Sequence, residues 1–209
     1  MKIVLVHGWG FTPAFWEPVR SRLTSETVVL DLGFFGAEKT TITDDEPVLA
    51  VGHSLGLMWL LTQAILPAGS RIIGINGFTR FGRADTFPMG VSPRVLERML
   101  TALQKDPHAV LRQFLTNCRM DVTQYACGEI PSVERLAEGL KLLKDGDARG
   151  NADCVQALLA SRDDPIVSSA MSESSVSLTC IHWAESGGHL LPLSRPELCV
   201  RFIEEAANV

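Results

Sequence analysis

A serine flanked by glycines, set between two apolar segments, constrains this chain more than any other feature. Residues 47–51 are apolar, Gly52-His53-Ser54-Leu55-Gly56 follows, and the next ten residues are nearly all apolar. That order predicts a buried strand, a tight turn and a buried helix. G-x-S-x-G between a strand and a helix is a nucleophile elbow, whose glycines permit close packing while the serine hydroxyl stays accessible. A chance match to the short motif is the alternative, and the strand–turn–helix context disfavours it. We predict that Ser54 is a nucleophile.

A second glycine-containing loop, His7-Gly8-Trp9-Gly10, follows the apolar segment at residues 3–6. Glycines after a strand allow backbone N–H groups to point into a cleft instead of pairing within the sheet. Taken alone, the segment is equally well explained as an ordinary glycine turn. Beside an elbow it becomes a candidate oxyanion hole, in which the N–H groups of Trp9 and Leu55 receive a developing negative charge.

Six short apolar segments are predicted to be strands, at residues 3–6, 28–32, 47–51, 71–76, 154–160 and 178–183. Helical patterns separate them without a hairpin signal, which predicts an α/β fold with a mostly parallel sheet and helices on both faces. Three amphipathic helices beginning near Ser92, Asp106 and Ser132 interrupt this alternation. They could be decoration, but insertions at the carboxyl ends of parallel strands surround the ligand crevice, so we predict a lid. The expected organisation is a core of residues 1–77 and 151–209 with a helical lid at 78–150.

A serine nucleophile needs a base, and neutral histidine, with a pKa of about 6.5, can serve near pH 7. His189 lies in a glycine-flanked loop after the last predicted strand and is the candidate base. His7 and His53 belong to the two glycine motifs, where their rings would be wrongly placed. His108 lies in the insertion, and His182 is expected to be a packed core residue within a strand.

The acid that orients the histidine should follow a strand between the serine and the histidine, because hydrolases with an elbow order their triad in that way. Asp163 and Asp164 both satisfy this condition. Either could instead be a capping or surface carboxylate, and only one can be the orienting acid.

Composition excludes several other classes. A net charge of −5 argues against a nucleic-acid-binding protein, which needs clustered basic charge. Five scattered cysteines without C-x-x-C spacing predict free thiols in a reducing compartment. The sequence shows no basic leader and no apolar run long enough for a membrane, so we expect a cytoplasmic monomer. No histidine or cysteine cluster has ligand spacing, so neither a metal nor an organic cofactor is expected.

The four motifs together resemble the α/β-hydrolase superfamily, and the match spans the chain from end to end. They are the oxyanion loop His7-Gly8-Trp9-Gly10, the elbow Gly52-His53-Ser54-Leu55-Gly56, the acid loop Asp164-Pro165-Ile166-Val167 and the histidine loop Gly188-His189. In this superfamily the acid directly precedes a short apolar turn, so the resemblance assigns the acid to Asp164. It implies a triad of Ser54, His189 and Asp164.

Within the superfamily the chain is most similar to the pimeloyl-[acyl-carrier protein] methyl ester esterases of biotin synthesis. This finer resemblance rests on His-Gly-Trp-Gly, on the lid helices and on residues 139–144 leading to Asp147-Ala148-Arg149. It implies a serine carboxylesterase that releases methanol from an ester carried on acyl carrier protein. The alternatives are a broad-specificity esterase or acyl thioesterase with the same triad, and a catalytically inactive hydrolase-fold binding protein.

The sequence departs from the superfamily pattern in three places. The first predicted strand leads directly into the oxyanion loop, so the N-terminal hairpin common in the superfamily is expected to be missing. Leu57 replaces the third glycine that many relatives have after the elbow, and we expect it to tighten the helix against its neighbours. The acid loop also lacks its usual glycine. None of these departures affects a triad residue.

The segment from residue 80 to residue 119 has a charge opposite to that of the whole chain. It contains seven basic and three acidic residues, a net charge of +4 in a chain of −5. Arg94 and Arg98 are four residues apart and therefore share a helix face. A solvated lid surface would explain these charges. We predict instead a docking patch for acyl carrier protein, formed by Arg80, Arg94, Arg98 and Arg112.

Overall fold

A computed structural model describes residues 1–42, 45–121 and 130–208. In this part of the chain six strands form one parallel sheet with the order β2-β1-β3-β4-β5-β6. The strands are β1 (Lys2–Val6), β2 (Thr27–Leu30), β3 (Val48–His53), β4 (Arg71–Ile75), β5 (Val155–Ser161) and β6 (Ile181–Ala184). The prediction of a parallel α/β sheet is confirmed.

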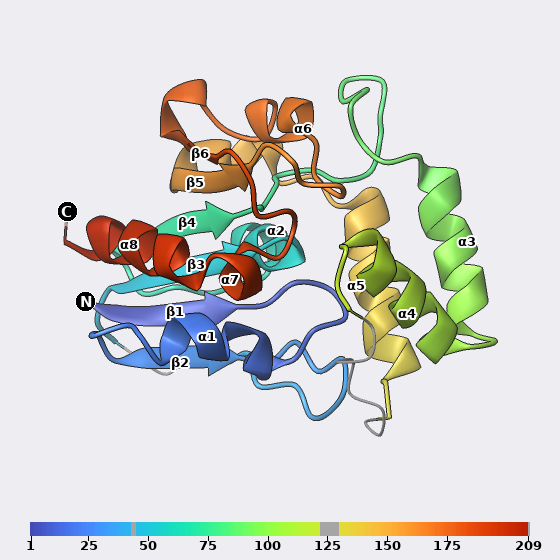
Figure 1. Ribbon diagram of the computed structural model, residues 1–209, viewed down its shortest axis with the longest axis horizontal. Coiled ribbons are helices and arrows are strands. Elements are labelled where there is room, and N and C mark those ends of the chain that lie inside the picture. The colour runs from blue at the N-terminus through green and yellow to red at the C-terminus, as the bar shows by residue number, and fades with distance from the viewer. Residues whose placement is uncertain (43–44, 122–129, 209) are drawn as a thin grey trace.

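Hydrophobic layers cover both faces of the sheet because successive strand residues point to opposite sides. In β1, Val4 and Val6 join one buried cluster while Ile3 and Leu5 join the other. Helix α2 (Leu55–Thr62) packs in the first cluster, and α1 (Glu17–Arg20) and α8 (Pro196–Ala207) in the second, on the near side in Figure 1. The predicted helices on both faces are confirmed. Shorter helical elements are η1 (Pro13–Trp16), η3 (Arg149–Cys154), α6 (Ser169–Glu173), η4 (Leu178–Cys180) and α7 (Leu191–Ser194).

Within the described residues, three further α-helices lie between β4 and β5 in sequence. They are α3 (Pro93–Leu103), α4 (Pro107–Asn117) and α5 (Val133–Asp145), and they gather beyond the carboxyl ends of the strands (Figure 1). Proline opens α3 and α4, and the Asp106 carboxylate caps α4 by accepting a hydrogen bond from the Ala109 N–H at 2.8 Å. Leu111 and Leu140 belong to the same buried cluster as α2. The insertion therefore shares the core of the sheet.

One local prediction in the C-terminal segment is wrong, and one helix begins differently from its local pattern. Ser194-Arg195-Pro196-Glu197 has the residue types of a capping box, but the Ser194 hydroxyl donates to the Gly187 carbonyl at 2.7 Å and α8 begins without a side-chain cap. His182 was expected in the core, yet it is exposed. Strand β6 is an edge strand, and the His182 ring lies against Phe202 at the sheet surface. Neither the sheet order nor the course of the loop before α8 is visible in the local sequence pattern.

The described residues include four of the five cysteines. Cys118, Cys154, Cys180 and Cys199 are free thiols, and Cys127 lies outside the described residues. Within that same part of the chain, no helix combines the length and apolar character that crossing a bilayer requires.

Candidate active site

Ser54 occupies a strained turn between β3 and α2. Its φ of 53° and ψ of −121° are unfavourable for a residue with a side chain. A Cβ on Gly52 would lie 2.4 Å from the Leu57 backbone, and one on Gly56 would lie 2.4 Å from the Val6 carbonyl oxygen. Both glycines are therefore required for the helix to pack this closely on the strands. This geometry is that of a nucleophile elbow.

Leu57 is accommodated by two glycines of the neighbouring strand and the loop after it. A Cβ on Gly74 would lie 2.7 Å from Leu57 Cδ2, and one on Gly77 would lie 2.7 Å from Leu57 Cβ. The leucine side chain is fully buried and fills the space that side chains at these two positions would need. Leu57 can therefore replace the superfamily's third glycine because Gly74 and Gly77 leave room for its side chain.

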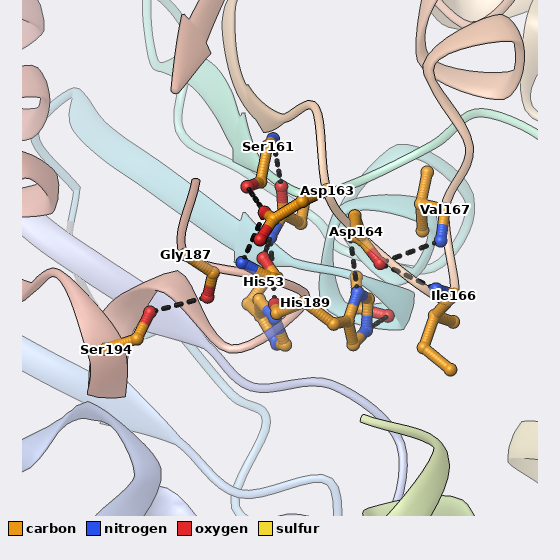
Figure 2. Close-up of polar contacts among 12 residues, drawn as sticks. His53, Ser161, Asp163, Asp164, Ile166, Val167, Gly187, His189 and Ser194 are labelled. Carbon is orange, nitrogen blue, oxygen red and sulfur yellow. Dashed lines mark hydrogen bonds and ion pairs between the residues drawn. The ribbon is translucent and has the colours of Figure 1, made fainter. Parts of the chain in front are cut away.

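The elbow serine, the loop histidine and one of the two candidate aspartates are adjacent in space. His189 Nε2 lies 3.1 Å from Ser54 Oγ, and His189 Nδ1 lies 2.8 Å from Asp164 Oδ2. Figure 2 shows the Asp164 side chain between the His189 ring and the backbone of Ile166 and Val167. Asp164 Oδ1 accepts hydrogen bonds from these two N–H groups at 2.7 and 2.9 Å. One carboxylate oxygen is fixed by the backbone, and the other accepts a hydrogen bond from the Nδ1–H of His189.

Asp163 faces a different set of partners. Its Oδ1 accepts hydrogen bonds from the Ser161 hydroxyl at 2.7 Å and the Gly188 N–H at 2.8 Å. The Ser161 hydrogen bond, followed by that from Gly188, lowers the pKa of the Asp163 carboxyl. Its other oxygen lies 3.9 Å from Arg119 at the end of α4. Asp163 therefore braces the histidine loop but does not contact the imidazole of His189.

In the described part of the chain, the two backbone N–H groups predicted to form an oxyanion hole are available to donate hydrogen bonds to a ligand. Leu55 is the first residue of α2, where an N–H has no partner within the helix. Among the described residues, neither the Leu55 N–H nor the Trp9 N–H donates to a protein group. The Trp9 indole donates to the Leu136 carbonyl at 2.9 Å and packs edge-on against Phe114. These contacts fix the loop that carries the Trp9 amide.

His53 contributes to the site in a way that sequence analysis missed. Its Nε2 donates to the backbone carbonyl of His189 at 2.9 Å. The ring is fully buried beside Phe11 and Phe15, and burial, reinforced by the nearby His189, holds the pKa of His53 well below its usual value. Its Nδ1 has no hydrogen-bond partner among the described residues. A neutral His53 thus serves as a donor to the histidine loop, and no spacing rule in the sequence indicated this.

A cavity and a groove lie near the oxyanion loop and the acid loop. The inner cavity, of about 150 Å³, is lined by residues that include Trp9, Leu140 and Ile166. The outer groove, of about 490 Å³, lies between α3 and α4 and includes Arg98 and Lys105 in its lining. The two volumes share the side chains of Val95, Met99, Phe114 and Asn117. Both volumes have mostly apolar linings, and the groove also carries the basic side chains of Arg98 and Lys105.

The four arginines predicted to form a docking patch are not equivalent. Arg94 and Arg98 are exposed on α3, and Arg112 is exposed on α4. The Arg80 side chain is only 13% exposed, and its guanidinium pairs with Asp147 at 2.6 Å. The expectation that Arg80 joins the patch is therefore corrected, because its guanidinium is mostly covered and is engaged by this ion pair.

Among residues 1–42, 45–121 and 130–208, no group of three or more His, Cys, Asp or Glu side chains is placed to hold a metal ion.

Comparison with known proteins identifies the family. The sequence model described as "Alpha/beta hydrolase family" matches residues 3–202. The chain belongs to the α/β-hydrolase family. Among curated proteins, this hydrolase is 31% identical over 176 residues to the pimeloyl-[acyl-carrier protein] methyl ester esterase of Aliivibrio salmonicida, covering 70% of this chain and 67% of that protein. It is 30% identical over 167 residues to the protein of the same name from Legionella pneumophila, covering 71% and 68%.

A solved structure shows the same fold at lower sequence identity. An esterase from Exiguobacterium antarcticum matches the hydrolase with a TM-score of 0.81 and 16% identity, over 100% of this chain and 92% of that chain.

Proposed function

We propose that this hydrolase is a serine carboxylesterase that cleaves the methyl ester of a pimeloyl group carried on acyl carrier protein. The observation that carries the chemistry is the continuous contact from Ser54 Oγ to His189 and from His189 to Asp164. The named activity of the relatives from Aliivibrio salmonicida and Legionella pneumophila supports the substrate.

The acylation step follows from this geometry. Ser54 Oγ attacks the ester carbonyl carbon while His189 Nε2 takes the hydroxyl proton. Asp164 holds the Nδ1 proton and stabilises the imidazolium that forms. The carbonyl oxygen gains negative charge and is stabilised by the N–H groups of Trp9 and Leu55. The tetrahedral intermediate collapses with loss of methanol, which receives its proton from His189, and leaves an acyl-serine.

Deacylation uses the same groups in reverse roles. His189 takes a proton from a water molecule, which attacks the acyl-serine carbonyl. The second intermediate again places its oxyanion on the two amides. Its collapse breaks the bond to Ser54 Oγ, and His189 returns the proton to the serine. The products are the free carboxylic acid and the regenerated enzyme.

The insertion between residues 78 and 150 acts as a lid that receives the acyl chain. Ser54 is only 6% exposed, so a substrate must enter through a defined path. The inner cavity and outer groove provide an apolar path of the kind that a methylene chain prefers. A carrier protein at the outer end of this path would leave the ester end of the chain near Ser54.

Acyl carrier protein docks on the exposed arginines of the lid. Arg94 and Arg98 lie along α3, and Arg98 also lines the outer groove. Positive charge at the mouth of the path attracts an acidic partner and speeds its encounter with the enzyme. Arg112 is exposed on α4 but does not line the groove, so we expect it to contribute less.

The proposal includes a cytoplasmic location. The free thiols of the described cysteines fit the reducing environment of that compartment.

The test is a comparison of substrates with the purified protein. Pimeloyl-carrier methyl ester should be hydrolysed to the free acid and methanol with a higher kcat/KM than short nitrophenyl esters. Ser54→Ala should lower turnover of both by several orders of magnitude, because triad members act as a unit. Preferential cleavage of acyl thioesters would assign a thioesterase instead. Absence of turnover and of labelling by a fluorophosphonate probe would indicate an inactive binding protein.

A further inference from the structure

A buried asparagine lies between the two loops that carry the acid and the base. Asn76 follows β4 directly, is only 1% exposed, and has a φ of 45°, in the left-handed region. Asparagine tolerates this conformation better than most residues with a side chain. Its backbone N–H donates to the Leu159 carbonyl in β5 at 2.8 Å. The backbone thus presents the amide side chain beside the end of β5.

Each polar group of the Asn76 amide has a partner. Its Oδ1 accepts a hydrogen bond from the N–H of Ser161, the last residue of β5, at 2.9 Å. Its Nδ2 donates to the backbone carbonyls of Gly188 at 2.8 Å and His189 at 2.9 Å. A buried amide with both its donor and acceptor groups satisfied holds its neighbours in fixed positions. A single side chain therefore links the end of β5, from which the chain continues to Asp164, to the backbone of the histidine loop.

The histidine loop needs such a link because glycines give it conformational freedom. Gly187 and Gly188 have φ values of 140° and 66°, and glycine adopts many conformations readily. The His189 carbonyl accepts one hydrogen bond from Asn76 and a second from His53 Nε2 at 2.9 Å. Two donors on one carbonyl fix the backbone from which the His189 imidazole projects.

We propose that Asn76 is a positioning residue that sets the distance between His189 and both Ser54 and Asp164. The proposal rests on the hydrolytic function proposed above. Asn76 acts through the backbone of residues 188 and 189, and the His53 donor supports it from the other side. The expected consequence is a loss of turnover without loss of substrate binding, because a misplacement of about 1 Å can reduce a rate about 100-fold.

Three variants separate this role from simple stabilisation. Asn76→Gly keeps the positive φ without strain and removes only the amide. Asn76→Asp keeps the shape but places a carboxylate oxygen against two carbonyl oxygens. Thr79→Val is the matched control, because the Thr79 hydroxyl is also fully buried and donates to the Ser175 carbonyl at 3.0 Å, away from the site.

Steady-state kinetics on a short nitrophenyl ester give the first readout. Asn76→Gly should lower kcat about 100-fold with KM changed less than about twofold. Asn76→Asp should lower it at least as much. Thr79→Val should keep the wild-type kcat while its melting temperature falls as much as that of Asn76→Gly. A wild-type kcat in Asn76→Gly, or an equal loss of kcat in Thr79→Val, would overturn the proposal.

A second readout does not depend on the substrate assignment. The proton shared between His189 Nδ1 and Asp164 should give a downfield proton NMR signal in the wild-type protein and in Thr79→Val. This signal should be lost or shifted in Asn76→Gly, and an unchanged signal would contradict the positioning role. If the wild-type protein hydrolyses no ester, the proposed function fails, whereas the NMR comparison still decides whether Asn76 positions His189.

Discussion

Asp163 and Asp164 are neighbours in sequence, but they hold different parts of the site. Asp164 Oδ2 contacts His189 Nδ1, whereas Asp163 binds the Ser161 hydroxyl and the Gly188 N–H. We predict that Asp164→Asn lowers kcat by roughly 10³–10⁴-fold, because it no longer fixes the histidine tautomer. Asp163→Asn keeps an acceptor oxygen and should cost far less. Initial rates on a nitrophenyl ester test this, and a greater loss in Asp163→Asn would move the acid to Asp163.

His53 makes stability depend on pH. Burial lowers its pKa in the folded protein, whereas in the unfolded chain the pKa is about 6.5. Below pH 6.5 the unfolded state therefore takes up a proton that the folded state does not, and the free energy of unfolding decreases. We predict a loss of about 1 kcal/mol between pH 6.5 and 5.5 from this group.

Urea unfolding at several pH values measures this effect. His53→Gln should have a smaller decrease in unfolding free energy between pH 6.5 and 5.5 than the wild-type protein. His182→Gln is the control, since His182 is exposed on the edge strand, and it should keep the wild-type slope. The hydrogen bonds from Ser161 and Gly188 lower the pKa of Asp163. Its contribution to the free energy of unfolding is therefore lost only below about pH 4, outside the range of this experiment. An unchanged slope in His53→Gln would show that folding does not lower the pKa of His53.

At the scale of elements, α2 and β4 fit together through one leucine and two glycines. Gly74→Ala should destabilise the protein by about 1–3 kcal/mol, because its methyl group would lie 2.7 Å from Leu57 Cδ2. Leu57→Ala should also destabilise it, because it leaves a cavity. The double variant should lose less than the sum of the two, since Leu57→Ala removes the Cδ2 atom that the new methyl group would overlap.

Chemical denaturation of the single and double variants gives the coupling energy. Gly150→Ala is a suitable control, because a Cβ at that position meets no atom within 4 Å. Strict additivity of Leu57→Ala and Gly74→Ala would disprove the steric account of the packing between α2 and β4.

At the scale of the whole molecule, residues 80–119 carry a net charge of +4 in a chain whose net charge is −5. Reversing Arg94 and Arg98 to glutamate should raise KM for the carrier-bound ester several-fold, because the patch attracts an acidic partner. The wild-type kcat/KM for this substrate should also fall as salt concentration rises. Turnover of a small nitrophenyl ester should be nearly unchanged in the same variant.

The control for this prediction carries the same change in net charge on another face. Arg20 and Arg201 are exposed on α1 and α8, which cover the sheet away from the lid. Reversing both to glutamate should leave KM for the carrier-bound ester near its wild-type value. Equal effects from the two double variants would assign the change to net charge and not to a docking patch.

Local signals determined the elements and most of the site candidates. The apolar run before Ser54, the flanking glycines and the loop position of His189 are short-range patterns, and each depends on backbone requirements that hold wherever the segment lies. They predicted the parallel sheet, the elbow and the three inserted helices without knowledge of any tertiary contact. From the residues alone, Asp163 and Asp164 stayed equivalent, because both follow the same strand.

The tertiary structure decided those features that depend on contacts between segments far apart in the sequence. Asp164 lies against His189, and Asn76 joins residues that are more than eighty positions away in sequence. The burial of Arg80 and the exposure of His182 depend, respectively, on the ion pair with Asp147 and on the sheet order. Hydrogen bonds and burial act between atoms in space, so no local period or motif encodes them. The sequence determined which chemical groups the chain carries, and the fold determined which of them touch.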